Sequence, residues 1–149
     1  MLYESLLNFF ESGWFVARND EQTFLRLLYD GKNGGEWVCY AQAYEEEHLF
    51  VFYSVLPTPV EESERMAMVE LLTRINCGLK IGNFEMDLAD GEVRYKTSVM
   101  LENDAWGNDV FRPVVFYNLS MMDRYWPAFQ ALLNDKRSPQ DSLALAVFD

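Results

Sequence analysis

The sequence is poor in the side chains on which most small metal and catalytic sites depend. Its 149 residues include one histidine and two cysteines. His48 follows three glutamates, Glu45–Glu47, but neighbouring residues of a polar turn point in different directions, whereas a stable transition-metal site needs converging ligands. Asp87, Asp90 and Glu92 surround an expected turn and lack the regular alternation of oxygen ligands that a calcium loop needs. We therefore expect no metal site.

The motifs of common enzyme classes are also missing. No Walker lysine follows a G-x-x-x-x-G run, no G-x-G-x-x-G occurs, and no nucleophile-elbow sequence is present. Chance pairs of carboxylates are inevitable among 24 acidic residues, so such pairs are no evidence for a two-carboxylate catalytic site. The sequence predicts a protein that is not an enzyme and has no cofactor. An enzyme of unrecognised type would require a cleft in which titratable side chains converge.

Basic residues are scarce, which excludes several kinds of partner. Lys and Arg number 12 against 24 Asp and Glu, giving a net charge of −12 and a pI of about 4.4. Nucleic acid and anionic membrane surfaces select basic proteins, so neither is an expected partner. No apolar run approaches the roughly 20 residues that span a bilayer. The N-terminal segment also lacks the basic region of a signal peptide.

The two cysteines, Cys39 and Cys77, lie in the apolar surroundings WVCYA and RINCGL. Disulfide frameworks are far denser in cysteine, so we expect two buried free thiols. Free thiols are typical of a reducing compartment, and the sequence therefore predicts a cytoplasmic protein.

Hydrophobic residues make up 50% of the chain and aromatic residues 15%, which excludes intrinsic disorder. Apolar spacing and turn signals predict the order α-β-β-β-β-α-β-β-α. The expected helices are 2–12, 59–78 and 109–133, and the expected strands are 14–18, 22–30, 36–45, 49–56, 84–88 and 93–97. These elements form one domain, 1–134, followed by a C-terminal tail, 135–149, that is apolar enough to pack on the body.

Three residues define details of the expected helices. Thr58 is predicted to cap the second helix, with Pro59 at its first position. Gly78 is predicted to end that helix in a left-handed conformation. Pro127, in the long helix, has no N–H to donate to the carbonyl of residue 123.

Asp90-Gly91 is a strong signal for a two-residue hairpin turn. When residues are counted outward from this turn, Leu88 pairs with Val93, and the last predicted pair is Phe84 with Thr97. This register places all apolar residues on one face and opposite charges on the other, with Glu85 facing Lys96. A slip of one residue would destroy both patterns.

The strand 49–56, LFVFYSVL, is apolar on both sides. An antiparallel strand with one solvated face should alternate between polar and apolar residues. We therefore expect both faces to be covered, one by helices and the other by the tail, a loop or a second copy. The segment 33–64 contains seven acidic residues and no Lys or Arg, which favours either a basic partner segment or solubility.

The run LLTRINCGLKIGNFEMDLADGEVRYKTSVMLE (71–102) resembles the signature region of the YbjN family of bacterial sensory transduction regulators. WVCYAQAYEEEHLFVFYSVLP (37–57) and SMMDRYWPAFQALL (120–133) are similar to its cyanobacterial branch. The resemblance implies an α+β fold like that of class I type III secretion chaperones, with a single curved antiparallel sheet and three helices. It implies no enzyme activity and transfers no active-site residue.

Two functional hypotheses follow. The first is a non-enzymatic, chaperone-like regulatory module, expected to be a homodimer, that binds a protein partner through a sheet face or edge or a groove beside the helices. Its candidate contacts are Tyr40, Tyr44, Phe50 and Phe52. The alternative is a small-molecule sensor with an apolar pocket between the long helix and the sheet, lined by Trp106, Tyr117 and Trp126.

Overall fold

Strict alternation along the strand β3 (Glu36–Tyr44) separates the two faces of a sheet. Trp37, Cys39, Ala41 and Ala43 are buried, and the residues between them are partly exposed. Successive side chains of a strand point to opposite faces, so the buried set marks the face that carries the core.

The computed structural model describes residues 1–148. The elements other than β3 are α1 (Leu2–Glu11), β1 (Val16–Asn19), β2 (Phe24–Asp30), β4 (Leu49–Val55), the 3₁₀ turn η1 (Glu62–Glu64), α2 (Arg65–Gly78), β5 (Asn83–Met86), β6 (Val93–Met100), α3 (Asn108–Leu133) and α4 (Pro139–Leu143). All neighbouring strands are antiparallel in one six-stranded sheet, in the order β1-β2-β3-β4-β6-β5. The predicted α+β fold with a single antiparallel sheet is confirmed, and α4 and η1 are additional.

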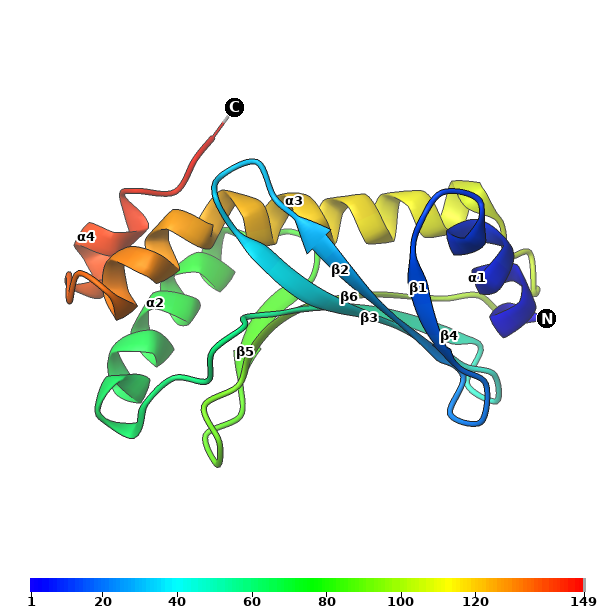
Figure 1. Cartoon of the computed structure of the whole chain (residues 1–149), viewed down its shortest axis with the longest axis horizontal. Coiled ribbons are helices and arrows are strands. Elements are labelled where there is room, and N and C mark those ends of the chain that lie inside the picture. Colours follow the sequence, from blue (N-terminus) through cyan, green and yellow to red (C-terminus); the bar gives the residue numbers. More distant parts are fainter. Residues whose placement is uncertain (149) are drawn as a thin grey trace.

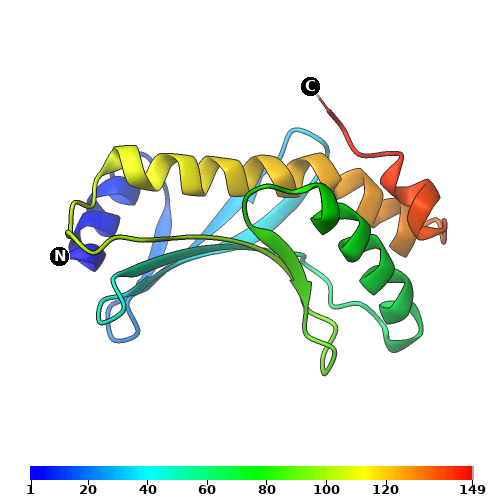
Figure 2. The same ribbon diagram turned by 180° about the vertical axis from the view of Figure 1, so that it is seen from behind.

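The helices lie on one side of the arched sheet (Figure 1, Figure 2). The long helix α3 runs across β4 and β6, with α1 near its first turns and α2 and α4 near its last turns. Within residues 1–148, no helix or strand lies over the other face of the sheet. No helix of this part of the chain, α3 included, is long and apolar enough to cross a membrane.

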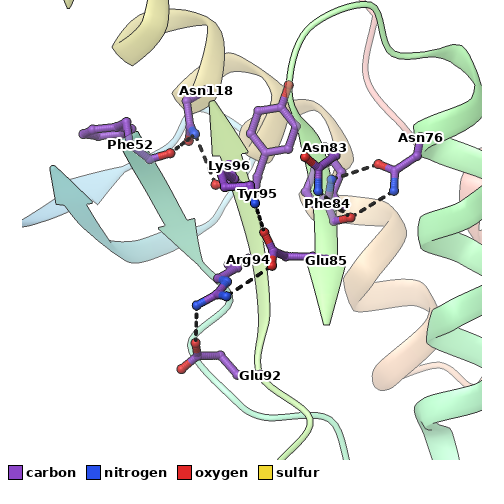
Figure 3. A network of polar contacts seen from close by, with 10 residues as sticks. All are labelled: Phe52, Asn76, Asn83, Phe84, Glu85, Glu92, Arg94, Tyr95, Lys96 and Asn118. Atoms are coloured by element: carbon purple, nitrogen blue, oxygen red, sulfur yellow. Dashed lines mark hydrogen bonds and ion pairs between the residues drawn. The ribbon is translucent and has the colours of Figure 1, made fainter. Parts of the chain in front are cut away.

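The outer edge of β5 is closed by a side chain of α2. The Asn76 Nδ2 donates to the carbonyl of Phe84 at 2.9 Å, and the Phe84 N–H donates to Asn76 Oδ1 at 2.8 Å (Figure 3). An open strand edge offers unpaired backbone groups to another chain. The Asn76 amide occupies those groups at Phe84, so this edge does not accept an added strand there.

The second helix begins later than the sequence predicts. Residues 57–61 are not helical, and α2 starts at Arg65 after η1. The Val60 N–H donates to the Gly91 carbonyl at 2.8 Å, which ties this segment to the loop before β6. Gly91 accepts this close approach because its φ is +81° and it has no Cβ to strike the Val60 carbonyl. The capping role predicted for Thr58 is therefore wrong.

The end of α2 also differs from the expectation. Gly78 is the last helical residue and the extended Leu79 follows it. Within the described chain, the glycines with positive φ are Gly34, Gly82 and Gly91. The left-handed conformation predicted for Gly78 is therefore wrong, because the chain leaves the helix through an extended residue.

The predicted hairpin register is wrong by two residues. Val93 pairs with Met86 rather than Leu88, and Phe84 pairs with Tyr95. The loop is longer because Asp87 and Asp90 accept hydrogen bonds from the backbone two residues on, at 2.9 Å each. A slip of two residues keeps the side chains of the paired strands on their predicted faces, so Phe84, Val93 and Tyr95 are buried, whereas Leu88 falls in the loop and is 60% exposed.

A buried asparagine ties α3 to the sheet. Asn118 is fully buried, and its Nδ2 lies 2.9 Å from the Phe52 carbonyl and 3.1 Å from the Tyr95 carbonyl (Figure 3). Its Oδ1 accepts a hydrogen bond of 2.6 Å from the Ser54 hydroxyl, which accepts one from Trp37 Nε1 at 2.9 Å. The network fixes α3 against β4 and β6.

The gap that Pro127 leaves in α3 is used by the loop between β2 and β3. Proline has no N–H, so the Asp123 carbonyl lacks its usual partner within the helix. Asn33 Nδ2 donates to that carbonyl at 3.0 Å, and the Asn33 N–H donates to the Asp123 carboxylate at 3.0 Å. Gly35 lies against the Trp126 ring, where a Cβ would overlap the ring. The loop is thereby held on α3.

The C-terminal tail extends the helical layer. Ser138 caps α4 by accepting a hydrogen bond of 3.1 Å from the Asp141 N–H. α4 contacts α2 and α3. The division at residue 134 that the sequence suggests therefore falls between packed helices, and the division itself stays a prediction. Residues 135–148 do not cover the other face of the sheet.

The two cysteines lie in different environments. Cys39 is buried, and burial raises the pKa of its thiol to about 12. Cys77 is exposed, so the prediction that both thiols are buried is wrong. The buried residues of α2 are Met68, Leu71, Leu72 and Ile75, and Cys77 lies away from that stripe.

One of the two cysteine thiols is expected to react rapidly with a thiol reagent in the native protein. The raised pKa and burial of Cys39 suppress its reactive thiolate, so only Cys77 should react rapidly with a chromogenic disulfide reagent at mildly alkaline pH. Cys77→Ser should remove the fast phase, and denaturant should expose the second thiol. Two fast phases in the native wild type would contradict this placement.

Candidate functional site: the open face of the sheet

The side of the sheet away from the helices carries a broad set of apolar side chains. We call it the open face. Exposed fractions reach 59% at Leu28, 39% at Tyr44 and 61% at Met100, and the other members are partly or largely buried by their neighbours. The apolar and aromatic side chains of the open face are Phe24, Leu28, Val38, Tyr40, Tyr44, Leu49, Val51, Tyr53, Val55 and Met100.

Strand register arranges these side chains in rows across the sheet. One row runs from Arg26 through Tyr40 and Tyr53 to Lys96. The next row runs from Leu28 through Val38 and Val55 to Arg94 and Glu85. Paired residues of antiparallel strands share a face. The centre of the open face is therefore apolar, with Arg26 on the β2 side and Lys96, Arg94 and Glu85 on the side of β6 and β5.

The rows enclose a shallow hollow of about 310 Å³. Phe24, Tyr40, Tyr53 and Val55 contribute its apolar lining, and Arg94 lies on its border. The rings of Phe24 and Tyr40 meet edge to face, with centroids 5.9 Å apart. A hollow of this volume has room for one large side chain.

The charges beside the hollow are largely neutralised by ion pairs. Arg94 lies 3.1 Å from Glu85 and 3.8 Å from Glu92, and Lys96 lies 3.1 Å from Glu85 (Figure 3). Burial disfavours ionisation of Glu85, but the hydrogen bonds from Lys96 and Arg94 outweigh it and lower the pKa of this carboxyl. The Arg94 guanidinium also lies 5.1 Å from the centre of the Tyr53 ring. An apolar centre with a polar margin is the usual composition of a protein-binding surface.

Two of the four predicted partner contacts lie on the open face. Tyr40 and Tyr44 do. Phe50 and Phe52 are fully buried on the helix side, where Phe52 stacks on Phe10 at 6.1 Å and Phe50 meets Phe111 at 5.1 Å. The folded chain leaves neither phenylalanine accessible, which corrects that part of the expectation.

Sequence reasoning missed the contributions of Phe24, Val38, Tyr53 and Val55. The signal for them is the spacing of the polar residues Glu36 and Gln42 in β3. Both fall on the same set of alternate positions, which marks the outward face of β3, and strand pairing then assigns the outward residues of β2 and β4.

The expected sensor pocket is not assembled by the fold. Trp106 precedes α3 and stacks on Phe111 at 5.7 Å. Trp126 lies 18 residues after Asn108, the first residue of α3, which is about 27 Å along a helix. Trp126 stacks on Trp37 at 5.7 Å. Together with the half-buried Tyr117, these residues are spread along α3 instead of surrounding one cavity.

The acidic residues of 33–64 do not form a single patch. Glu45 accepts hydrogen bonds from the Leu2 and Tyr3 N–H groups, at 3.2 and 2.7 Å, and thus caps α1. Glu36 lies at the other end of β3, about 30 Å away along a strand of this length. His48 is exposed and 3.5 Å from Asp104. Within residues 1–148 no three His, Cys, Asp or Glu side chains are grouped to hold a metal ion.

Comparison with known sequences agrees with this architecture. The YbjN family, described as "Putative bacterial sensory transduction regulator", matches residues 11–131. The chain belongs to the YbjN family. A search of curated protein sequences found no significant match to this YbjN chain.

Two solved structures share the fold at low sequence identity. A chain of the crystal structure of the ExsC–ExsE complex is 17% identical, with a TM-score of 0.59, and the match covers 89% of this chain and 92% of that chain. A chain of the HopA1–SchA chaperone–effector complex is 12% identical, with a TM-score of 0.53, and the match covers 84% and 93%. The fold of this YbjN protein is thus similar to that of type III secretion chaperones.

Proposed function

We propose that this YbjN protein is a chaperone-like regulatory module that binds a protein partner on the open face of its sheet. The observation that carries the proposal is the aromatic and aliphatic surface centred on Tyr40, which no element of residues 1–148 covers. Contiguous exposed apolar patches with a polar border mark interaction sites on soluble proteins.

The open face suits an extended polypeptide. Tyr40, Tyr53 and Phe24 provide large and rather rigid contact areas, and the hollow between them takes one anchoring side chain. Burial raises the pKa of the Tyr53 hydroxyl, so this group stays protonated and can donate a hydrogen bond to a partner. The closed edge at Phe84 disfavours strand addition beside β5, which favours the face over this edge.

The comparisons support a binding role. Both structural neighbours are protein complexes, and one is described as a chaperone–effector complex. The description of the YbjN family as a transduction regulator agrees with a protein that acts by binding. The proposal therefore includes no catalysis and no cofactor. It includes a cytoplasmic location, as the free thiols suggest.

The homodimer expected from the sequence is part of the proposal, with the open face as one surface on which a second copy fits. Light scattering coupled to size-exclusion chromatography tests this part. A mass near twice 17.4 kDa is expected, and a strict monomer over a wide concentration range would contradict the dimer.

Site-specific photo-crosslinking tests the open face. With benzoyl-phenylalanine in place of Tyr40, we expect adducts to a protein partner in cells. The same probe in place of Met66, which is 73% exposed on α2, is the matched control and should give none. Adding Tyr44→Asp should lower the Tyr40 adduct yield about ten-fold, because it places on the same face of β3 a charge that is costly to bury under a partner.

Each outcome of the crosslinking experiment bears on the proposal. An adduct with a different protein at position 40 alone supports partner binding. An adduct between two copies supports the dimer and contradicts a separate partner at this position. Absence of any adduct at 40, or equal adducts at 40 and 66, would overturn the proposal.

A further inference from the structure

A second hollow lies away from the open face, between the segment 56–61 and the last turns of α3. It has a volume of about 400 Å³, within the range of about 300–1,000 Å³ that is usual for ligand pockets. Its apolar lining includes Pro57, Pro59, Trp126 and Leu133, and we call it the proline groove. It shares no lining residue with the open-face hollow, so the two surfaces are separate.

Both walls of the proline groove are fixed by contacts elsewhere in the fold. On one side, the Leu56 N–H donates to the Val93 carbonyl at 2.8 Å, and Arg65 Nε donates to the Val60 carbonyl at 3.0 Å. On the other side, Trp126 is held between Gly35 and the ring of Trp37. The groove is preformed, so a ligand does not have to order it.

The border of the groove is acidic. Glu36, Glu61 and Glu64 line it together with one cation, Lys136. Lys136 pairs with Glu64 at 3.1 Å, whereas Glu36 and Glu61 have no ion-pair partner in the part of the chain that the structure describes. Three carboxylates and one ammonium give the lining a net charge of −2.

We propose that the proline groove binds a short segment of a partner protein in which a lysine or arginine adjoins an aliphatic residue. The aliphatic side chain packs on Trp126 and the two prolines, and the cation pairs with Glu36 or Glu61. The long apolar stem of lysine or arginine also packs on such a wall while its charged end reaches the carboxylates. An acidic segment is repelled by the same border.

This geometry gives individual acidic residues of the segment 33–64 different roles. Glu45 is engaged in capping α1, and Glu36 and Glu61 are brought together at one groove although 24 positions separate them. This inference does not require the open face to bind anything. A partner that uses both surfaces would gain avidity from the linkage between its two segments.

The test uses two pools of acetylated, amidated pentapeptides on the intact protein. Both pools have randomised aliphatic residues and proline around a central residue, which is lysine in one pool and glutamate in the other. Binding is followed through the indole N–H resonance of Trp126 in two-dimensional NMR spectra. Lysine peptides selected on the wild type should shift this resonance, and the affinity should fall with added salt.

Matched charge variants separate a groove from a general charge effect. Glu36→Gln/Glu61→Gln should weaken the selected lysine peptides at least ten-fold. Glu46→Gln/Glu47→Gln, which changes the net charge equally at the exposed turn after β3, should leave binding unchanged. Tyr44→Asp on the open face should also leave it unchanged, so failure of this inference is distinguishable from failure of the proposed function.

The opposite results overturn the inference. In the first, no lysine peptide that shifts the Trp126 resonance is selected. In the second, peptides from the glutamate pool are selected as readily as those from the lysine pool. In the third, the Glu36→Gln/Glu61→Gln and Glu46→Gln/Glu47→Gln variants lose binding equally. Folding of every variant is checked by the dispersion of the same NMR spectra.

Discussion

Phe52→Ala is expected to lower the free energy of unfolding by about 3–5 kcal/mol, the usual cost of truncating a buried aromatic side chain. Phe52 is fully buried in β4, stacks on Phe10 at 6.1 Å and lies 6.4 Å from the Phe50 ring. Removing its ring leaves a cavity between α1 and the sheet, and the surrounding backbone is held by strand pairing on both sides. The site therefore cannot collapse to fill the space.

Chemical denaturation of the purified variants measures this cost. Tyr44→Ala is the matched control, because it truncates an aromatic residue of the adjacent strand that points to the open face and is 39% exposed. We expect a change of less than about 1 kcal/mol for Tyr44→Ala. A small cost at Phe52 together with a large one at Tyr44 would reverse our assignment of the two faces.

Asn118→Leu is expected to destabilise the protein by at least about 3 kcal/mol, because several buried groups lose their partners and each costs about 1–3 kcal/mol. The carbonyls of Phe52 and Tyr95 and the hydroxyl of Thr97 lose a donor, and the Ser54 hydroxyl loses its acceptor. Leucine has the same number and branching of side-chain heavy atoms as asparagine, so an empty cavity does not explain the effect. Breaking part of a buried network is worse than having an apolar core.

The same substitution at an exposed position provides the control. Asn108→Leu, in the first turn of α3, should change the free energy of unfolding by less than about 1 kcal/mol. Equal midpoints for Asn118→Leu and the wild type in a denaturant titration would show that the network does not contribute to stability. The open face is on the other side of the sheet, so partner binding by folded Asn118→Leu should be retained.

The two proposed surfaces make different demands on a partner. The open face offers a wide apolar area, and beside its hollow the charges of Glu85, Arg94 and Lys96 are paired with one another. The proline groove offers a narrow apolar hollow with two carboxylates that have no ion-pair partner in residues 1–148. The first suits a broad contact in which shape and area dominate, and the second suits selection by charge. One protein can thus bind a long partner on the open face and select, in the proline groove, a partner that carries a short basic motif.

Local periodicity was sufficient for the order of the elements and for much of the core. Alternation in β3 and spacing by three and four in α3 depend only on neighbours in the chain, so the sequence predicts them directly. The effect of Pro127 was also local, since the lost helix bond follows from the missing N–H. The donor that replaces the missing N–H at the Asp123 carbonyl is Asn33, from a loop 90 positions earlier, and only the tertiary structure reveals it.

The sequence by itself determined the α+β element order, the YbjN resemblance and the pairing of side chains into two sets on each strand. Tertiary structure alone decided which set of β4 is buried, where the hairpin register settles, where α2 begins and which acids share a groove. Alternation is unchanged by a slip of two residues or by exchange of the two faces. Long-range contacts, such as Val60 with Gly91 and Asn118 with the sheet, remove that ambiguity because they exist in one arrangement only.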